Sequence, residues 1–254
     1  MNSPLPCPCC GRTHAPAADA FEGVRLSVLM PVYNERQTVA AIVERVLAVK
    51  IPKEIIIVDD GSTDGTADVL EKLADRTDNT PGNSLRVIRH PSNLGKGAAV
   101  ARAAAAATGA LAIIQDADLE YSPDEYYHLL LPILRNEADV VYGSRFLGGS
   151  PRRVLYFWHA VGNRLVTLLS NMFTNLNLTD VETGYKAFRT DLLQSIPIRQ
   201  KGFGFEIEIT SKIARRRCRV FEVGISYFGR TYEEGKKITW RDGLRALVLV
   251  LKYR

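Results

Sequence analysis

Short apolar runs alternate along the chain with segments of helical periodicity, and this alternation constrains the fold more than any other feature. Runs of this kind are typical of strands that are buried on both faces of a parallel sheet. Between the first two runs, residues 36–48 repeat apolar side chains every three or four positions, as an amphipathic helix does. The pattern predicts an α/β fold with a mostly parallel, doubly wound sheet and helices on both faces. The predicted strands are Leu26–Val32, Glu54–Val58, Leu85–Ile88, Leu111–Ile114 and Val140–Tyr142.

Length and composition exclude several classes of protein. The 254 residues suffice for one large α/β domain, and 46% apolar with 24% charged residues is ordinary for a folded globular chain. No run reaches the roughly 18 apolar residues of a spanning helix, and no secretory signal is recognisable. Four cysteines are too few for a disulfide scaffold. We therefore expect neither a membrane-spanning nor an exported protein. The expected location is the cytoplasm.

The first 22 residues are rich in Pro and Ala, show no periodicity, and are expected to form a flexible tail. They contain Cys7, Cys9, Cys10 and His14 at a spacing that suits a zinc site poorly, so the sequence leaves open whether these residues bind a metal. One domain is expected over residues 23–237, followed by an amphipathic helix over 238–254.

Charge is distributed unevenly between the two halves of the chain. Residues 1–143 contain 13 Lys or Arg and 19 Asp or Glu, whereas residues 144–254 contain 20 basic and 9 acidic residues. An acidic half joined to a basic half predicts two partners, a cation in the first and an anion in the second. Surface charge that only serves solubility is the alternative.

Polar motifs follow the predicted strands, at the edge of a doubly wound sheet where ligands bind. The first run ends in Pro31–Glu35, and the second is followed by Asp59–Thr66. Adjacent carboxylates repel each other, and a nucleobase could satisfy them with its N–H groups. We expect this role for Asp59 and Asp60, and a helix cap for Asp64.

The third and fourth runs lead into a different kind of motif. A glycine-bearing turn with Lys96 opens the helix after the third run and suits either a phosphate or close helix packing. The fourth run is followed by Asp116, Asp118 and Glu120, whose alternation places all three carboxylates on one side of an extended backbone. Clustered hard oxygens favour Mg²⁺ or Mn²⁺ that also binds a diphosphate. A structural ion pair is the alternative.

Together these motifs resemble those of the family 2 glycosyltransferases, which have the GT-A nucleotide-diphospho-sugar transferase fold. Asp116–Asp118 is similar to the family's D-x-D motif, and Pro31–Glu35 and Asp59–Thr66 are similar to its nucleoside-binding loops. The resemblance extends from about Val24 to Lys237. It implies a metal held by Asp116, Asp118 and Glu120. It also implies a nucleotide-sugar site formed by Pro31, Tyr33, Glu35, Asp59, Asp60, Lys96, Asp116 and Ala117.

The basic half contains two predicted helices with informative faces. The helix over Val154–Phe173 carries a polar stripe of His159, Asn163, Thr167 and Ser170. We expect this stripe to face an acceptor headgroup at a membrane interface, with ordinary helix packing as the alternative. In the helix over Phe203–Arg217, periodicity directs Glu206 inward and Glu208 toward solvent. An inward carboxylate needs a partner, so Glu206 is a candidate site residue.

The motifs of this half are similar to those of dolichyl-phosphate mannose synthases and bacterial polyprenyl-phosphate glycosyltransferases. The similar segments are Gly143–Phe146, Thr183–Arg189 and Arg230–Lys237. His159 and Asn163 stand where those synthases tend to carry Arg and Ser, which leaves mannose and glucose donors, GDP-mannose or UDP-glucose, equally open. The resemblance implies that a polyprenyl phosphate acceptor contacts Arg145, His159, Asn163, Arg230 and Lys237.

The acceptor determines which residues the chemistry needs. A phosphomonoester is already an anion at neutral pH and needs cations to hold it, whereas a sugar or protein hydroxyl needs a general base, here Asp180 or Glu182. We expect inverting hexose transfer to the lipid phosphate. The catalytic candidates are Asp118, Arg145, Asp180 and Glu206.

The last predicted helix offers a peripheral contact with the cytoplasmic face of a membrane. Its apolar face comprises Trp240, Leu244, Leu247, Val248 and Leu251, with Arg241, Arg245 and Lys252 on another face. Packing on the core is the alternative. A non-catalytic sugar-nucleotide or lipid-binding protein is the competing class, no nucleic-acid partner is expected, and the sequence does not indicate an oligomeric state.

Overall fold

The computed structural model describes residues 21, 23–75, 82–148, 151–154, 156–202, 204–231, 233–234 and 240–254. The cysteines and histidine of the N-terminal segment, and Lys237 of the expected acceptor set, lie outside these residues. Phe21, which the sequence assigns to the tail, is instead buried, with its ring edge-on to Tyr127 at 5.2 Å.

The core of the structure is a seven-stranded sheet in which every neighbouring pair is parallel except the two pairs that include β6. In spatial order the strands are β3 (Ser84–Arg89), β2 (Lys53–Asp59), β1 (Leu26–Val32), β4 (Leu111–Ile114), β6 (Lys186–Arg189), β5 (Val140–Ser144) and β7 (Val220–Gly224). All the strands predicted from apolar runs are confirmed within two residues at either end. The strands β6 and β7 were not predicted, because four or five residues flanked by charged side chains give too weak a signal.

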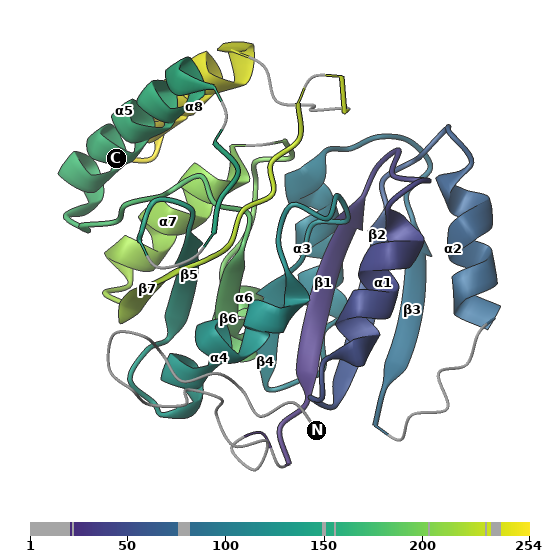
Figure 1. Cartoon of the computed structure of the whole chain (residues 1–254). Helices are drawn as coiled ribbons and strands as arrows, with labels where there is room; N and C mark the ends of the chain where they lie inside the picture. The colour runs from purple at the N-terminus through teal and green to yellow at the C-terminus, as the bar shows by residue number, and fades with distance from the viewer. Residues whose placement is uncertain are drawn as a thin grey trace.

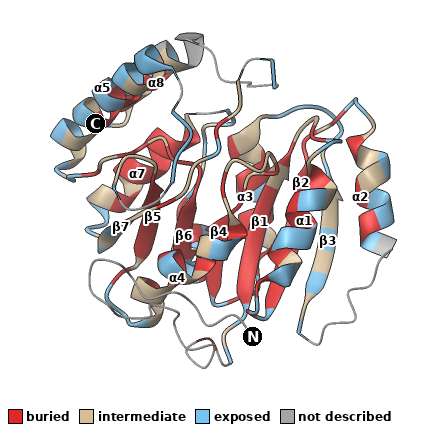
Figure 2. Cartoon of the chain, in the orientation of Figure 1, coloured by how far each residue is buried: buried red, intermediate tan, exposed pale blue. Residues whose placement is uncertain are grey.

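Helices cover both faces of the sheet, as the alternating pattern predicts (Figure 1). One face packs against α1 (Val39–Ala48), α2 (Thr66–Asp75), the short 3₁₀ helix η2 (Pro123–Glu125) and α4 (Tyr126–Leu134). The other packs against α3 (Lys96–Ala106), α5 (Phe157–Thr174), α6 (Thr190–Ser195), α7 (Phe205–Arg215) and α8 (Trp240–Lys252). The sheet between these layers is largely buried (Figure 2). Within the described residues, no helix combines the length and apolar character needed to span a bilayer.

Strand order positions the site. The chain moves from β1 outward to β2 and β3, then crosses back to β4 on the other side of β1. Loops that follow β1 and β4 therefore diverge at the carboxyl edge of the sheet, which is where a ligand can enter. The motifs that follow β1, β2 and β4 meet there, as expected.

One helix-face prediction is wrong. Glu208 is completely buried rather than solvated, because the loop before α7 folds back and donates the N–H groups of Arg199 and Gln200 to it, while Lys212 pairs with it. The polar stripe of α5 packs inward, as the alternative of ordinary helix packing requires, and its contact with an acceptor headgroup stays a prediction. Asn163, Thr167 and Ser170 are buried against the protein.

The C-terminal helix α8 packs beside α5 and over α7 (Figure 1). It buries Ala246 and Val250, whereas Val248 and Leu251 of the expected membrane face remain exposed. Leu247 of that face is half-buried. The side chains of Trp240, Arg241 and Leu244 lie outside the described part of the chain. The helix therefore uses part of its apolar surface for packing within the fold.

At the opposite edge of the sheet from the site, Glu54 of β2 anchors the loop that precedes β4. Its Oε1 accepts hydrogen bonds from the Ser27 hydroxyl at 2.6 Å and from the N–H groups of Thr108 and Gly109 at 2.5 and 3.0 Å. Burial alone would raise the pKa of Glu54, but these hydrogen bonds hold it below its ordinary value of 4.5. The ionised form therefore stabilises the fold.

We predict that Glu54→Gln lowers the free energy of unfolding by about 2 kcal/mol near neutral pH, because buried N–H donors lose a charged acceptor. Since the folded pKa is depressed, this stabilisation is present above the ordinary value of 4.5 and is lost as pH falls through the folded pKa. The difference between the variant and the wild type should therefore shrink in acid. Urea denaturation across this pH range measures it, with the exposed Glu71→Gln as control. Equal stability of the two variants at neutral pH would contradict the assignment.

Candidate active site at the carboxyl edge of the sheet

Asp60, at the end of β2, holds the loop that leads into α3. Its Oδ1 accepts hydrogen bonds from His90 Nδ1 at 2.7 Å and Leu94 N at 3.0 Å, and its Oδ2 accepts one from Gly95 N at 2.7 Å. Asp60 is 2% exposed. Both carboxylate oxygens therefore serve the protein, and Asp60 shapes the site by fixing this loop.

Asp59, its neighbour, is differently placed. Its Oδ1 accepts a hydrogen bond from Ser62 N at 3.0 Å, and its Oδ2 lies 3.5 Å from Arg89 Nε. Within the described part of the chain, this buried Oδ2 has no hydrogen-bond donor. A cleft of about 540 Å³ is formed by residues that closely follow Asp59 and by the end of β3; it is lined by Gly61, Ser62, Thr63, Arg89, His90 and Pro91. Buried acceptor atoms are normally satisfied, so Asp59 is suited to a ligand that carries N–H or O–H groups.

The loop after β1 brings a third acid into the site. Pro31 and Tyr33 are half-buried at the end of this strand, and Glu35 is buried one turn before α1. The loop is tied to the loop after β2 by Glu35 N, which donates to the Thr66 hydroxyl at 3.0 Å. Glu35 Oε2 accepts a hydrogen bond from the Thr38 hydroxyl at 2.7 Å. The carboxylate is thereby aimed across the site rather than along the helix.

Asp116, after β4, faces a cation from α3. Lys96, the first residue of α3, lies with its Nζ 2.8 Å from Asp116 Oδ2 and 3.6 Å from Glu206 Oε1 in the first turn of α7. Although burial lowers the pKa of Lys96, the charges of Asp116 and Glu206 raise it above its ordinary value. The close approach requires a glycine at position 184, where a Cβ would stand 2.5 Å from Asp116 Oδ2 and 2.9 Å from Lys96 Nζ.

Arg230 holds the remaining acids together from a distant part of the sequence. Its guanidinium binds Glu35 at 3.0 and 3.1 Å and approaches Asp118 Oδ2 at 3.4 Å. Its backbone N–H donates to Glu120 Oε1 at 2.8 Å, and the Tyr227 hydroxyl donates to Glu120 Oε2 at 3.0 Å. The sequence predicted Arg230 as an acceptor-phosphate residue, but its side chain here contacts the carboxylates.

The three acids after β4 suit a divalent cation without forming a complete site. The side chains of Asp116, Asp118 and Glu120 are each 15–18% exposed. Within the described ranges, no group of three or more acidic, histidine or cysteine residues is close enough to hold a metal by itself. Burial and the charges of Asp116 and Glu120 raise the pKa of Asp118 to about 7. Lys96 and Arg230 supply the positive charge in this arrangement. The hard oxygen donors fit Mg²⁺ or Mn²⁺ that also binds ligand phosphates. Ala117, between the acids, is packed in the core.

Glu206 and Lys186 are two buried ionisable residues behind the site, and the charge of each influences the other. Burial raises the pKa of Glu206 to about 7, although the charges of Lys96 and Lys186 oppose this rise. Burial lowers the pKa of Lys186 to about 8, and Glu206 offsets only part of that effect. Among the described atoms, Glu206 Oε2 finds no hydrogen-bond partner. The inward direction predicted for Glu206 is confirmed.

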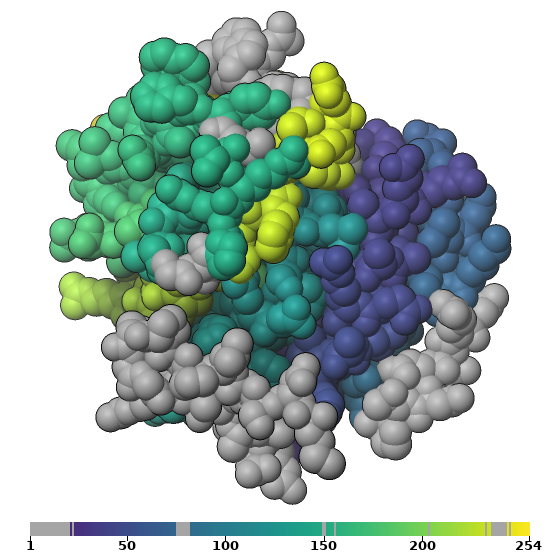
Figure 3. All heavy atoms as spheres, viewed as in Figure 1, coloured from purple at the N-terminus to yellow at the C-terminus, as the bar shows by residue number. Residues whose placement is uncertain are grey.

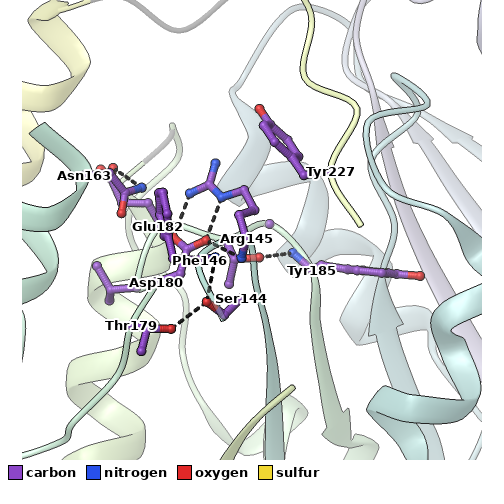
Figure 4. Close-up of polar contacts among 12 residues, drawn as sticks. Ser144, Arg145, Phe146, Asn163, Thr179, Asp180, Glu182, Tyr185 and Tyr227 are labelled. Atoms are coloured by element: carbon purple, nitrogen blue, oxygen red, sulfur yellow. Dashed lines mark hydrogen bonds and ion pairs between the residues drawn. The ribbon is translucent and has the colours of Figure 1, made fainter. Parts of the chain in front are cut away.

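The second half of the site centres on Arg145, which follows β5 (Figure 4). Its Nε and Nη2 donate to the two oxygens of Asp180 at 2.6 and 2.7 Å, and its backbone N–H donates to Oδ2 at 3.1 Å. Asp180 is completely buried, and its own N–H donates to Glu222. The ring of Tyr227 lies 5.4 Å from Arg145 Cζ. Asp180 therefore fixes the direction of a cation that remains partly exposed.

Helix α5 borders this half of the site with its polar stripe. Asn163 Nδ2 donates to Glu182 at 3.2 Å (Figure 4). The Thr167 hydroxyl accepts a hydrogen bond from Val181 N at 3.3 Å. His159, one turn earlier, is half-buried with its ring 5.3 Å from that of Tyr156. The structure thus places His159 and Asn163 on the same side of α5 as the residues 180–182.

Two kinds of residue were missed by the sequence reasoning. Lys186 is completely buried in β6, where its Nζ donates to the carbonyls of Val181 and Thr183 and lies 4.5 Å from the Tyr142 ring centroid. Tyr227 contacts both Glu120 and Arg145 and so joins the two halves of the site. A lysine inside a short apolar strand was the available signal for the first, whereas nothing local marks the second.

The site therefore has two poles of charge. One pole gathers carboxylates from the strand ends around Lys96 and Arg230, beside a cleft with an unsatisfied acceptor. The other presents Arg145 on a buried carboxylate. Such an arrangement can bind a cation-associated anionic ligand next to a second anion.

Comparison with known proteins agrees with this geometry. The profile of Glycosyl transferase family 2 matches residues 27–196. The chain is 29% identical over 225 residues to an undecaprenyl-phosphate mannosyltransferase of Micrococcus luteus. This match covers 84% of this chain and 87% of that protein. It is 30% identical over 212 residues to a polyprenol monophosphomannose synthase of Mycolicibacterium smegmatis, with 81% and 78% covered.

A solved structure shares the fold. Glucosyl-3-phosphoglycerate synthase from Mycobacterium tuberculosis, crystallised with Mn²⁺, UDP-glucose and phosphoglyceric acid, superposes with a TM-score of 0.69 at 21% identity. The superposition covers 94% of this chain and 85% of that one. The expected GT-A architecture is thereby confirmed.

We predict that Gly184→Ala weakens Mn²⁺ binding in the presence of a nucleoside diphosphate by about tenfold or more, because the new methyl group displaces Asp116 and Lys96 from each other. Both displaced atoms are the ends of side chains, so the variant should fold. Electron paramagnetic resonance of free Mn²⁺ measures the binding. Gly162→Ala, with no atom within 4 Å of the added carbon, is the matched control. Unchanged Mn²⁺ affinity in Gly184→Ala would show that Asp116 is not held in place by this contact.

Proposed function

The chain belongs to glycosyl transferase family 2, and from that premise we propose that it transfers a hexose, with inversion, from a nucleoside diphosphate sugar to polyprenyl phosphate. The observation that carries the proposal is the Arg145–Asp180 pair, in which both oxygens of a buried carboxylate bind one guanidinium. The similarity to two prenyl-phosphate sugar synthases supports the same acceptor.

The pair argues against Asp180, one of the two candidate bases with Glu182, as the general base that a hydroxyl acceptor would need. A hydroxyl needs a carboxylate that can take its proton, but both oxygens of Asp180 are engaged by Arg145 within 2.7 Å. To accept a proton, Asp180 would first have to release the guanidinium of Arg145. A phosphomonoester has a second pKa of about 6, so it is already an anion at neutral pH and needs only a positioned cation. Arg145 supplies this cation, and the excess of basic residues after position 143 favours the same kind of ligand.

The donor occupies the other pole in this proposal. The nucleoside lies at the cleft that follows Asp59, where its N–H and O–H groups satisfy the buried Oδ2, and it extends toward Pro31, Tyr33 and Glu35 at the end of the neighbouring strand β1. Lys96 and Asp116 lie toward the diphosphate. A divalent Mg²⁺ or Mn²⁺ held by Asp116, Asp118 and Glu120 would neutralise the charge that grows on the departing nucleoside diphosphate.

The residues of this chain mainly bind and orient the donor and the acceptor. Arg145 orients an acceptor oxygen toward the anomeric carbon, on the side opposite the leaving diphosphate, and Asp180 keeps Arg145 in one rotamer. Asn163 and His159 line the same side of the acceptor phosphate. Arg230 can reach that phosphate only after it leaves Asp118 and Glu120. Glu206 balances the charge of Lys96 behind the diphosphate.

The proposal extends to the donor and the location. GDP-mannose and UDP-glucose are the proposed donors. Because a polyprenyl chain lies in a bilayer, the protein acts at a membrane, which we propose it contacts peripherally from the cytoplasmic face.

A donor and acceptor panel tests this function. Incubation of each nucleotide sugar with polyprenyl phosphate and Mg²⁺ or Mn²⁺ should give a charged glycolipid from GDP-mannose or UDP-glucose, whereas the corresponding polyprenol should give none. Chelation of the metal, or Asp118→Ala, should lower turnover by about a hundredfold or more. Asp124→Ala, at an exposed position in η2 shortly after this loop, is the control. Transfer to a polyprenol or a sugar hydroxyl, or undiminished transfer by Asp118→Ala, would reject the proposal.

We predict that Asp180→Asn raises the KM for polyprenyl phosphate by about tenfold, because Arg145 loses its charged partner, while the pH profile of kcat keeps its shape. A general base would behave differently, since its loss lowers kcat and removes the acidic limb of that profile. Steady-state kinetics against pH measures both. Asp139→Asn, which removes a comparable pairing with Arg219 at the start of β5, should leave the KM unchanged.

A further inference from the structure

Lys186 is a buried cation that the proposed reaction does not use. It lies in β6, between β4 and β5, and is completely buried. Its Nζ donates hydrogen bonds to the carbonyl oxygens of Val181, at 3.1 Å, and of Thr183. Within the described part of the chain these hydrogen bonds go to main-chain carbonyls only, and the Tyr142 ring centroid lies 4.5 Å from Nζ. A buried ammonium is costly unless its donors are satisfied, so the position of the two carbonyls indicates what the residue does.

The carbonyls belong to a segment that connects the two poles of the site. Residues 180–184, which we call the connecting turn, have no regular secondary structure and are largely buried. At one end, Asp180 binds Arg145 through both carboxylate oxygens, at 2.6 and 2.7 Å (Figure 4). At the other end, Gly184 lies against the carboxylate pole, since a Cβ there would stand 2.5 Å from Asp116 Oδ2. The connecting turn therefore contacts both poles within five residues.

The charge on Lys186 is influenced by both poles as well. Burial lowers the pKa of Lys186 to about 8, and the charges of Glu206 and Asp180 oppose this fall. The positive charges of Lys96 and Arg145 act in the same direction as burial. Lys96 and Glu206 belong to the carboxylate pole, whereas Asp180 and Arg145 form the other. With a pKa of about 8, the ammonium is mostly protonated at neutral pH.

The other contacts to the main chain inside the connecting turn are weaker. Val181 N donates to the Thr167 hydroxyl at 3.3 Å, and Gly184 N donates to the Tyr121 hydroxyl at 3.4 Å. Both are long hydrogen bonds between neutral groups, and a hydrogen bond with one charged partner is roughly twice as strong. Lys186 is therefore the strongest contact to the main chain of residues 181–184 in the described structure.

A second connection between the poles lies on the surface. The residues that follow β7, yellow in Figure 3, cross the molecular surface between the green and the purple parts of the chain. Among them, Tyr227 contacts Glu120 through its hydroxyl and Arg145 through its ring. The connecting turn joins the same poles from the interior, where its carbonyls bind Lys186 instead of water.

We propose that Lys186 is a positioning residue for sugar transfer, because its ammonium fixes the connecting turn and thereby the distance between the two poles. The inference rests on the proposed function, since only a reaction between two bound substrates needs the poles in register. Arg145 holds the acceptor phosphate at one pole, and Lys96 and Asp116 face the donor diphosphate at the other. In-line attack depends steeply on position, and a misplacement of about 1 Å can cost about a hundredfold in rate.

Lys186→Met tests the inference, because it removes the charge and keeps an unbranched side chain of similar length. Each pole keeps its own ion pair, so the KM for the nucleotide sugar and for polyprenyl phosphate should stay within about threefold of the wild-type values. The kcat of transfer should fall by about a hundredfold, because the poles lose register. Hydrolysis of the nucleotide sugar by water needs only the carboxylate pole and should keep its rate. Glycolipid formation, and nucleoside diphosphate release without acceptor, measure the two reactions.

Lys53 provides a matched control at the opposite edge of the sheet. It begins β2, is 1% exposed, and its Nζ donates to the carbonyl oxygens of Val49 at 2.7 Å and Leu47 at 3.5 Å. Lys53→Met removes the same kind of contact but should leave the ratio of transfer to hydrolysis at its wild-type value. Lys186→Arg, which retains a charged donor, should restore transfer to within about tenfold of the wild type.

Hydrogen exchange tests the connecting turn independently of the acceptor. The amides of residues 181–185 should exchange at least about tenfold faster in Lys186→Met than in the wild type, whereas Lys53→Met should leave them unchanged. If Lys186→Met does not fold, Lys186→Gln, with a shorter and neutral side chain, tests the same expectations.

Three results would overturn the inference: wild-type kcat in Lys186→Met, transfer and hydrolysis that fall together, or unchanged exchange in the connecting turn. An equal loss of transfer in Lys53→Met would do the same. If the wild-type protein transfers no sugar to polyprenyl phosphate, the proposed function fails, while the exchange experiment still decides whether Lys186 fixes the turn.

Discussion

Carboxylates from three separate loops converge at the carboxyl edge of the sheet, and the rest of the site depends on how their charge is balanced. Glu35, Asp116 and Asp118 lie where burial makes an uncompensated charge costly. Cations distant in sequence compensate them: Lys96 begins α3, and Arg230 arrives from beyond β7. Lys96 belongs to the acidic half of the chain and Arg230 to the basic half, so part of the uneven division of charge between the halves is balanced at this site.

The same balance explains why the acids are poised for a ligand. Arg230 contacts three carboxylates, yet its Nε is buried without a hydrogen-bond acceptor in the part of the chain that the structure describes. A guanidinium has a fixed planar fork and satisfies three diverging carboxylates imperfectly. A small divalent ion with ligand phosphates has no such limit on direction. The arrangement is therefore stable enough to keep the loops in place and leaves room for a better-matched cation.

Sequence reasoning succeeded where the signal was local and failed where a distant segment decided the outcome. Apolar runs placed β1 and β4 at their observed bounds, and the alternation at residues 116–120 located the acids. Helical periodicity misjudged Glu208, because backbone N–H groups of Arg199 and Gln200 fold back over that face. Periodicity also revealed the polar stripe of α5 but not its direction. The stripe is buried by residues 180–182, whose return to α5 no local pattern encodes.

The segment from Tyr227 to Glu234 connects the two poles of the site and contacts the residues just before α5. Arg230 in this segment binds the acids, while the segment's Gly229 carbonyl and Glu234 carboxylate bind Arg153, just before α5. Tyr227 contacts Glu120 through its hydroxyl and Arg145 through its ring. Arg230, which binds the acids, and the partners of Arg153 therefore lie on one segment of the chain. Because Tyr227 in the same segment contacts Glu120 and Arg145, this segment joins the carboxylate pole of the site to the Arg145 pole.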